Sequence, residues 1–302
     1  MHNPIATSAA APPVVDIRRV TRLFGSKKAL DDLSLCVPRG GVFGLIGGNG
    51  AGKTTVIKHI LGLLKAQTGS VRVFGLDPVE NPVGTLGRIG YLSEDRDLPD
   101  WMTVSELMRY TQAFFPAWDE AYAAELREAF DLDPNARIKT LSRGQRARAG
   151  LLVAVAHRPE LLVLDEPSSG LDPVVRRDIL GAIIRTIADE GRTVLFSSHL
   201  LDEVERVADR VAIIHDGRIL LTAPMDEIKE SHRRMTLRFG QSHNRPPALV
   251  GALSFEGEGS DWTYICSGES GQLRRAAEAL GATVMDDAPL TLDEIFVSRV
   301  LN

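Results

Sequence analysis

The sequence predicts an α/β fold built around a parallel sheet, followed by a small C-terminal α+β domain. Apolar runs at residues 42–46, 161–164 and 193–196 have the length of buried parallel strands, and stretches of helical spacing separate them. Beyond about residue 230 the hydrophobic runs shorten, and Gly, Ser and Pro cluster. We therefore expect a main domain at residues 14–230, with a helical subdomain at about 95–158, and an accessory domain at 231–302.

The composition excludes several classes of protein. With 44% hydrophobic and 25% charged residues the chain is globular, and its net charge of −5 argues against a nucleic-acid binder. Cys36 and Cys266 are isolated, which indicates a reduced, cytoplasmic setting. Residues 1–13 lack the features of a signal peptide, and we interpret them as a disordered tail. Because no run approaches the roughly 18 apolar residues of a membrane helix, we expect any membrane role to be peripheral.

The first elements are short strands at residues 14–20 and 33–37, with a loop between them that carries Phe24. An aromatic ring at this place either stacks on a base or anchors the loop by hydrophobic contact. Both interpretations stay open on these residues alone.

A glycine loop follows the strand at 42–46 and precedes a helix that begins near residue 55. Gly47, Gly52, Lys53 and Thr54 fill the pattern G-x-x-x-x-G-K-[ST], in which backbone N–H groups wrap phosphates. We expect Lys53 to reach the β- and γ-phosphates and Thr54 to bind Mg²⁺. The expected nucleotide-binding residues here are Gly47, Gly48, Asn49, Gly50, Ala51, Gly52, Lys53, Thr54 and Thr55.

Two strands, at 70–74 and 89–92, come next, and the second ends in the acidic stretch SEDRDLPD. Glu94, Asp95 and Asp97 in this stretch form a solvated acidic loop, or one of them is a metal ligand, because the stretch follows a strand. Helical spacing then runs from 103 to 130 with an interruption at Pro116, as expected of an inserted helical subdomain.

The stretch TLSRGQ opens another helix at residues 140–145. A Ser-x-Gly-Gln turn at a helix N-terminus suits an anion, although Ser142 also fits a plain N-cap. Arg143 and its neighbouring arginines either contact a ligand or form a solvated face.

Acidic residues and a histidine end the next two strands. Asp165 and Glu166 follow the run at 161–164, where a first acid holds Mg²⁺ in P-loop enzymes and a second stands beside the γ-phosphate as a base. His199 follows the strand at 193–196, at the edge where open α/β sheets bind ligands. We also predict a helix at 200–208 and a hairpin at 211–221 around Asp216 and Gly217.

The accessory domain is predicted to contain strands at residues 236–239 and 262–266 and one helix at 271–280. No catalytic constellation is found in it.

With these motifs in order, residues 14–221 resemble the ATP-binding subunit of an ABC transporter. GGNGAGKTT resembles Walker A, LLVLDE resembles Walker B, SGLD with Asp172 resembles the D-loop, and His199 resembles the switch histidine. The family signature is matched by Leu141, Ser142, Arg143, Gly144 and Gln145.

The resemblance implies a P-loop NTPase fold with ATP and Mg²⁺ as ligands. Glu166, His199 and Lys53 are then the catalytic residues, and Thr54, Asp165 and Glu94 the metal ligands. It makes Phe24 the adenine-stacking residue. It also implies a homodimer, or a heterodimer with a related ATPase, in which the signature of one subunit covers ATP held by the other.

Three positions depart from the family pattern. Arg143 stands where glycine is usual, Glu94 where glutamine is usual, and Phe24 where tyrosine is commoner. Glu94 keeps a metal-binding oxygen but adds a negative charge.

The C-terminal stretch APLTLDEIFVSRV is similar to the tails of ATPases from bacterial drug, antibiotic or lipid exporters. We therefore expect an ATP-hydrolysing subunit at the inner face of the membrane that powers a separate permease for export. The alternative is a soluble ABC-type ATPase that remodels a macromolecule.

Overall fold

The computed structural model describes residues 12–188 and 191–300, and it divides into two compact units. The first unit contains Met1–His199 and Ile214–Ile219, and the second contains Leu200–Ile213 and Leu220–Asn302. Most of the predicted tail at 1–13 lies outside the described residues, and the boundary near residue 230 stays a prediction. No helix in the described part is both long and apolar enough to span a membrane.

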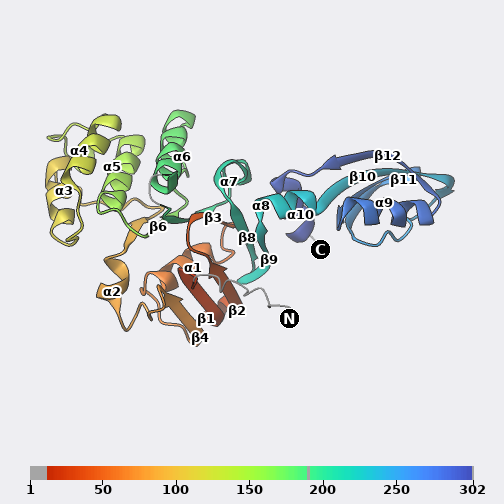
Figure 1. The fold of residues 1–302 in the computed structure, drawn as a ribbon, viewed down its shortest axis with the longest axis horizontal. Helices are drawn as coiled ribbons and strands as arrows, with labels where there is room; N and C mark the ends of the chain where they lie inside the picture. Colours follow the sequence, from red (N-terminus) through yellow and green to blue (C-terminus); the bar gives the residue numbers. More distant parts are fainter. Residues whose placement is uncertain (1–11, 189–190, 301–302) are drawn as a thin grey trace, which may run out of the picture. The chain divides into compact units, whose positions relative to one another are not determined.

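The first unit begins with an antiparallel sheet in the order β2-β1-β4 (Figure 1). Its strands are β1 Val15–Phe24, β2 Lys27–Val37 and β4 Thr68–Val73. The stretch around Phe24, expected as a loop, is a tight hairpin in which Phe24 pairs with Lys27. Consecutive residues on both sides of the turn are exposed, so this part of the sequence lacks the alternation of apolar and polar residues that marks a half-buried strand.

A parallel sheet in the order β5-β6-β7-β3 forms the centre of the first unit. Its strands are β3 Gly41–Ile46, β5 Ile89–Leu92, β6 Leu161–Asp165 and β7 Thr193–Ser198. All residues of β6 and β7 are buried, which explains their continuous apolar runs. In register, Asp165 pairs with Ser197 and Ile46 with Ser198, so the carboxyl ends of three strands meet at one edge.

Helices complete the first unit. They are α1 Lys53–Ile60, α2 Pro82–Leu86, α3 Val104–Gln112, α4 Glu120–Ala129, η1 Ile138–Thr140, α5 Arg143–Val155 and α6 Pro173–Ala188. The break expected at Pro116 separates α3 from α4, and both lie beside α5 (Figure 1). Thr103 and Asp119 cap α3 and α4 with their side-chain oxygens.

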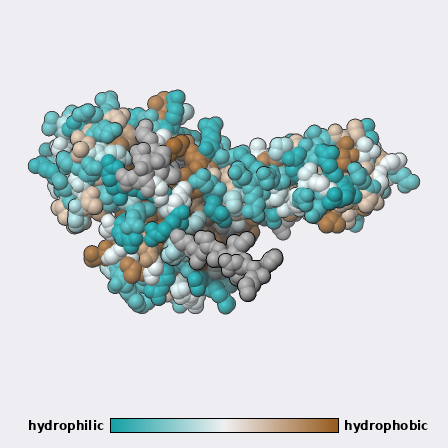
Figure 2. Space-filling model, viewed as in Figure 1, coloured by the Kyte–Doolittle hydropathy of each residue, from teal (hydrophilic) through white to brown (hydrophobic). Residues whose placement is uncertain are grey.

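The short helix α2 was not expected from the sequence. Pro82 occupies its first position, where a missing N–H costs little, and a five-residue stretch shows too little periodicity to be recognised. Its Val83 side chain is 89% exposed, and Figure 2 shows hydrophobic residues at the surface of α2.

The second unit contains a three-stranded antiparallel sheet in the order β11-β10-β12. Its elements are α7 Leu201–Val207, α8 Met225–Glu230, β10 His232–His243, β11 Ala252–Ser267, α9 Ser270–Ala279, β12 Ala282–Pro289 and α10 Leu292–Val300. Figure 1 shows α9 against this sheet, with a core that includes Leu237, Tyr264 and Leu273. The strands β8 Arg210–His215 and β9 Arg218–Pro224 flank the Asp216–Gly217 turn and belong in part to each unit.

The sequence predicts one helix in the C-terminal region, at residues 271–280, and α9 lies there. It misses the strand β12 and the helix α10. Two consecutive acids, Asp286 and Asp287, interrupt the apolar alternation of β12, and one of them is buried in an ion cluster that the sequence does not reveal.

Candidate functional site

The loop between β3 and α1 has a backbone shaped for an anion. A side chain at Gly47 would collide with the carbonyl oxygen of Ile214, and Gly52 has a φ of 116°, in the left-handed region that favours glycine. Within the described chain, no side chain caps the N-terminus of α1 at Lys53. Its first N–H groups and the helix dipole therefore suit a phosphate.

A cleft of about 380 Å³ opens in front of this loop. The predicted residues that line it are Phe24, Gly48, Asn49, Gly50, Gly52, Lys53, Thr54, Thr55, Glu94 and Glu166. Ala51 is buried behind the loop, where its carbonyl accepts a hydrogen bond from Gly217 N. One cleft thus brings together residues that lie far apart in the sequence.

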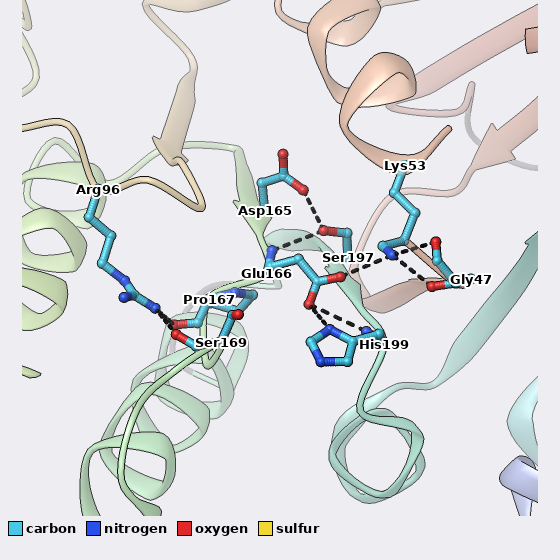
Figure 3. A network of polar contacts seen from close by, with 10 residues as sticks. Gly47, Lys53, Arg96, Asp165, Glu166, Pro167, Ser169, Ser197 and His199 are labelled. Carbon is cyan, nitrogen blue, oxygen red and sulfur yellow. Dashed lines mark hydrogen bonds and ion pairs between the residues drawn. The ribbon is translucent and has the colours of Figure 1, made fainter. Parts of the chain in front are cut away.

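Lys53 holds its ammonium between the loop and an acid. Its Nζ donates to the carbonyls of Gly47 at 2.6 Å and Gly48 at 3.2 Å, and lies 3.0 Å from Glu166 Oε1 (Figure 3). Both side chains of this ion pair are only 6% exposed. A buried ion pair is maintained only when further hydrogen bonds satisfy the charges, which the two carbonyls do for Lys53.

Glu166 lies directly after β6 and has a φ of 47°, unusual for a residue with a side chain. Its N–H donates to Ser197 Oγ at 2.9 Å, and the Ser197 hydroxyl donates to Asp165 Oδ1 at 2.6 Å. His199 Nδ1 lies 2.7 Å from Glu166 Oε2 (Figure 3). The neighbouring ends of β6 and β7 therefore hold both acids and the histidine in one hydrogen-bonded group.

The three predicted metal ligands are close enough to line one cavity. Thr54, Glu94 and Asp165 all border a second cleft of about 420 Å³, and Thr54 and Glu94 border the first cleft as well. Among the described residues no group of three His, Cys, Asp or Glu forms a complete metal cage. One hydroxyl and two carboxylates fit Mg²⁺, which commonly takes few protein oxygens and completes its shell with water and substrate phosphates.

Electrostatics at Glu94 follow from its neighbours. Partial desolvation, followed by the negative charges of Asp165, Glu166 and Asp95, raises the pKa of the Glu94 carboxyl above its ordinary value. Desolvation, followed by the negative charges of Asp165, Asp95, Asp97 and Glu94, raises the pKa of Tyr91 to about 12. A cation among these acids would relieve the repulsion.

Phe24 lies at the end of β1 on the wall of the cleft, and 46% of its surface is exposed. The guanidinium carbon of Arg22 lies 4.8 Å from the centre of the Phe24 ring. The cleft also includes Lys27 and Ala29 of β2, which sequence reasoning missed. Both belong to the stretch expected as a loop, and only the hairpin geometry turns them toward the glycine loop.

The signature residues do not border this cleft. Ser142 caps α5 in a reciprocal capping box, in which its Oγ accepts from Gln145 N and Gln145 Oε1 accepts from Ser142 N. Leu141 and Gly144 are half-buried, and Arg143 is exposed. Asp172 similarly caps the start of α6 by accepting from Val174 N and Val175 N, and the Val175 bond is the main cause that lowers its pKa.

A parallel sheet that carries a glycine loop and buried acids at its carboxyl edge defines the P-loop NTPase class of α/β proteins. Comparison with solved structures agrees. The structure of an ATP-binding subunit of an ABC transporter superposes with a TM-score of 0.66 at 28% identity, covering 72% of this chain and 92% of that one. The predicted fold class is confirmed.

Sequence comparison defines the family. The ABC transporter model matches residues 30–169. The uncharacterized ABC transporter ATP-binding protein YhaQ of Bacillus subtilis (strain 168) is 37% identical over 76% of this chain and 80% of its own length. The daunorubicin/doxorubicin resistance ATP-binding protein DrrA of Streptomyces peucetius is 35% identical over 74% of this chain and 69% of its own. The chain belongs to the family of ABC transporter ATP-binding proteins.

One further relative extends through the second unit. The bacitracin transport ATP-binding protein BcrA of Bacillus licheniformis is 29% identical over 95% of this chain and 97% of its own length.

Proposed function

We propose that this chain binds and hydrolyses MgATP and thereby powers a separate membrane permease in export. The observation that carries the proposal is the group of Lys53, Glu166 and His199 beside an uncapped helix N-terminus and an open cleft. These residue types at this spacing supply a phosphate cradle, a charge-stabilising cation and a base.

In this proposal the glycine loop and Lys53 hold the β- and γ-phosphates, and the ring of Phe24 stacks on the adenine. The γ-phosphate takes the place of Glu166 as the partner of the Lys53 ammonium, which frees the carboxylate to accept a proton from the attacking water. His199, hydrogen-bonded to Glu166, stabilises the charge that develops on the transferring phosphoryl group. Thr54, Asp165 and Glu94 would hold Mg²⁺, which neutralises charge on the phosphate oxygens.

We propose a dimer because the signature residues are not among those that line the cleft of their own chain. In this proposal a second ATP-binding subunit supplies the N-terminus of α5, with Ser142 and Gly144, to the cleft. Its first-turn N–H groups would then meet the γ-phosphate from the opposite side.

Export through a permease is supported by the names of relatives and by exposed apolar side chains. One relative is named for bacitracin transport and another for drug resistance. Trp101 and Phe114, which flank α3, are 69% and 63% exposed, and such side chains commonly mark partner surfaces. We assign this part of the helical subdomain as the contact with a permease at the cytoplasmic face of the membrane.

The test is affinity purification of the tagged chain from detergent-solubilised membranes, combined with a phosphate-release assay. We expect a polytopic membrane protein to co-purify and to raise ATP turnover. ATP hydrolysis that needs only soluble partners would instead support a macromolecule-remodelling ATPase.

The proposed dimer is tested by light scattering. Glu166→Gln should form a dimer in the presence of MgATP. Adding Ser142→Arg should abolish that dimer, because bulk and charge then fill the signature turn.

A further inference from the structure

A buried arginine lies in the acidic stretch that follows β5, and the sequence alone assigns it no role. Arg96 is only 7% exposed and has a φ of 51°. Among the described residues no carboxylate forms an ion pair with it, and its Nε is buried without a hydrogen-bond partner. A cation that gives up water at this cost needs a compensating contact.

That contact is the backbone directly after Glu166. Arg96 Nη2 donates to the carbonyl of Ser169 at 2.7 Å and to the carbonyl of Pro167 at 3.2 Å (Figure 3). Ser169 N in turn donates to the carbonyl of Glu166 at 3.1 Å, which closes the turn. The two hydrogen bonds from the Arg96 guanidinium therefore stabilise the turn that begins at Glu166.

A second arginine approaches the same turn from the signature. Arg143 Nη1 lies 3.2 Å from the position that a Cβ on Gly170 would occupy, so a side chain there would press on the guanidinium. Residues 167–170 are thus flanked by one arginine from the loop after β5 and one from α5.

This arrangement matters because Glu166 adopts a strained backbone conformation. A residue with a side chain and a φ of 47° is maintained only when its surroundings over-determine it. The N–H bond to Ser197 fixes the side of Glu166 that faces β7, and the two carbonyl bonds from Arg96 fix the turn on its other side.

We propose that Arg96 is a positioning residue for Glu166, holding the catalytic turn 166–169 through the carbonyls of Pro167 and Ser169. The proposal rests on the proposed function, in which Glu166 is the base. Arg96 lies two residues after Glu94, on the segment that leads into the helical subdomain.

The test compares Arg96→Gln and Arg96→Lys with Arg72→Gln, which changes an exposed arginine of β4. Arg96→Gln should lower single-turnover phosphate release by roughly tenfold or more, with MgATP affinity within about threefold of the wild type. Arg96→Lys keeps the charge and bulk, but its single ammonium cannot reproduce the planar guanidinium, so an intermediate loss is expected. Arg72→Gln should behave as the wild type.

A double-mutant cycle separates positioning from a merely structural role. In the Glu166→Gln background, Arg96→Gln should cause little further loss, because no base is left to position. Equal losses in both backgrounds would overturn the proposal, and so would normal turnover of Arg96→Gln. If that variant does not fold, Arg96→Lys in the same cycle gives the decision. A wild-type chain without ATPase activity would overturn the proposed function, whereas an active wild type with an active Arg96→Gln would overturn only this inference.

Discussion

Glu166 in the first unit and Asp287 in the second are both buried carboxylates with basic partners, yet their surroundings differ. Asp287 is saturated: Arg233, Arg274 and Ser270 all donate to its carboxylate, and the side chain is 3% exposed. Glu166 is held by Lys53 and His199 at the wall of an open cleft. A buried acid whose partners face a cavity can exchange them for a ligand, whereas a closed cluster can only stabilise the fold.

The backbone repeats this contrast. Glu166 has a left-handed φ, while Asp287 lies within the strand β12, paired with Met235 of β10. At Glu166 a strained backbone and partners that a ligand can replace therefore occur together, as is common at functional sites.

Replacing Lys53 should have the largest effect on the open site. Lys53→Ala removes the cation that carries the phosphate contacts and leaves Glu166 buried without its ion-pair partner. We expect MgATP affinity to fall by on the order of 10²-fold, since a hydrogen bond to a charged group is worth roughly 1.5–3 kcal/mol, and turnover to be lost. Calorimetric titration measures this, with exposed Lys65→Ala as the matched control. Tight nucleotide binding by Lys53→Ala would contradict the assigned cradle.

Replacing Asp287 should act on stability alone. Asp287→Ala leaves Arg233 and Arg274 without their carboxylate and should lower the free energy of unfolding of the second unit by about 3 kcal/mol. The matched control is Asp261→Ala, which breaks a solvent-exposed pair with Arg238 on the same sheet and should lower the free energy of unfolding far less than Asp287→Ala does. Denaturant unfolding gives both values. MgATP binding should be unchanged in both variants, and a loss of affinity in Asp287→Ala would remove the distinction between the two acids.

The closed cluster also predicts a pH dependence. Burial alone would raise the pKa of Asp287, but hydrogen bonds from Arg233 and Arg274 outweigh it and lower the pKa below its ordinary 3.8. A depressed folded-state pKa stabilises the fold above the unfolded-state value and loses that contribution as the pH falls through the folded-state value. The stability difference between wild type and Asp287→Ala should therefore be complete near pH 7 and shrink below about pH 4. A stability difference between the two proteins that grows as the pH falls would contradict a lowered pKa of Asp287.

The smallest expected effect concerns Glu94. Glu94→Ala removes one proposed metal oxygen and should slow hydrolysis while leaving MgATP affinity within a few-fold, because the glycine loop and Lys53 provide most phosphate contacts. Glu94→Gln, which keeps an oxygen and removes the charge, should retain more activity than Glu94→Ala. If turnover and permease coupling are unchanged in both variants, Glu94 is not a metal ligand and belongs to a solvated acidic loop.

The sequence predicts the open site better than the closed one. The glycine loop and the strand-end acids are local patterns, because each needs only a short strand and its following turn, so the sequence alone singles out Lys53, Asp165 and Glu166 as candidates. The cap of α5 at Ser142 is equally local.

Contacts between distant segments could not be predicted in this way. Arg96 meets the carbonyl of Pro167 across 71 residues, and Lys27 faces the cleft only because β1 and β2 form a hairpin. The ion cluster of Asp287 depends on Arg233, which is 54 residues away, so β12 read as polar and was missed. The partners of these side chains are set by the fold, and the sequence around each residue does not identify them.

The central claim, that Glu166 is the base of an open and exchangeable site, is tested most directly by Glu166→Gln. Glutamine keeps the shape of the side chain and can still accept a hydrogen bond from His199, but it cannot accept a proton from water. The measurement is single-turnover phosphate release at saturating MgATP, together with MgATP affinity. The account predicts a fall in the chemical step of roughly 10²-fold or more with affinity retained. A Glu166→Gln protein that releases phosphate at the wild-type rate would contradict it.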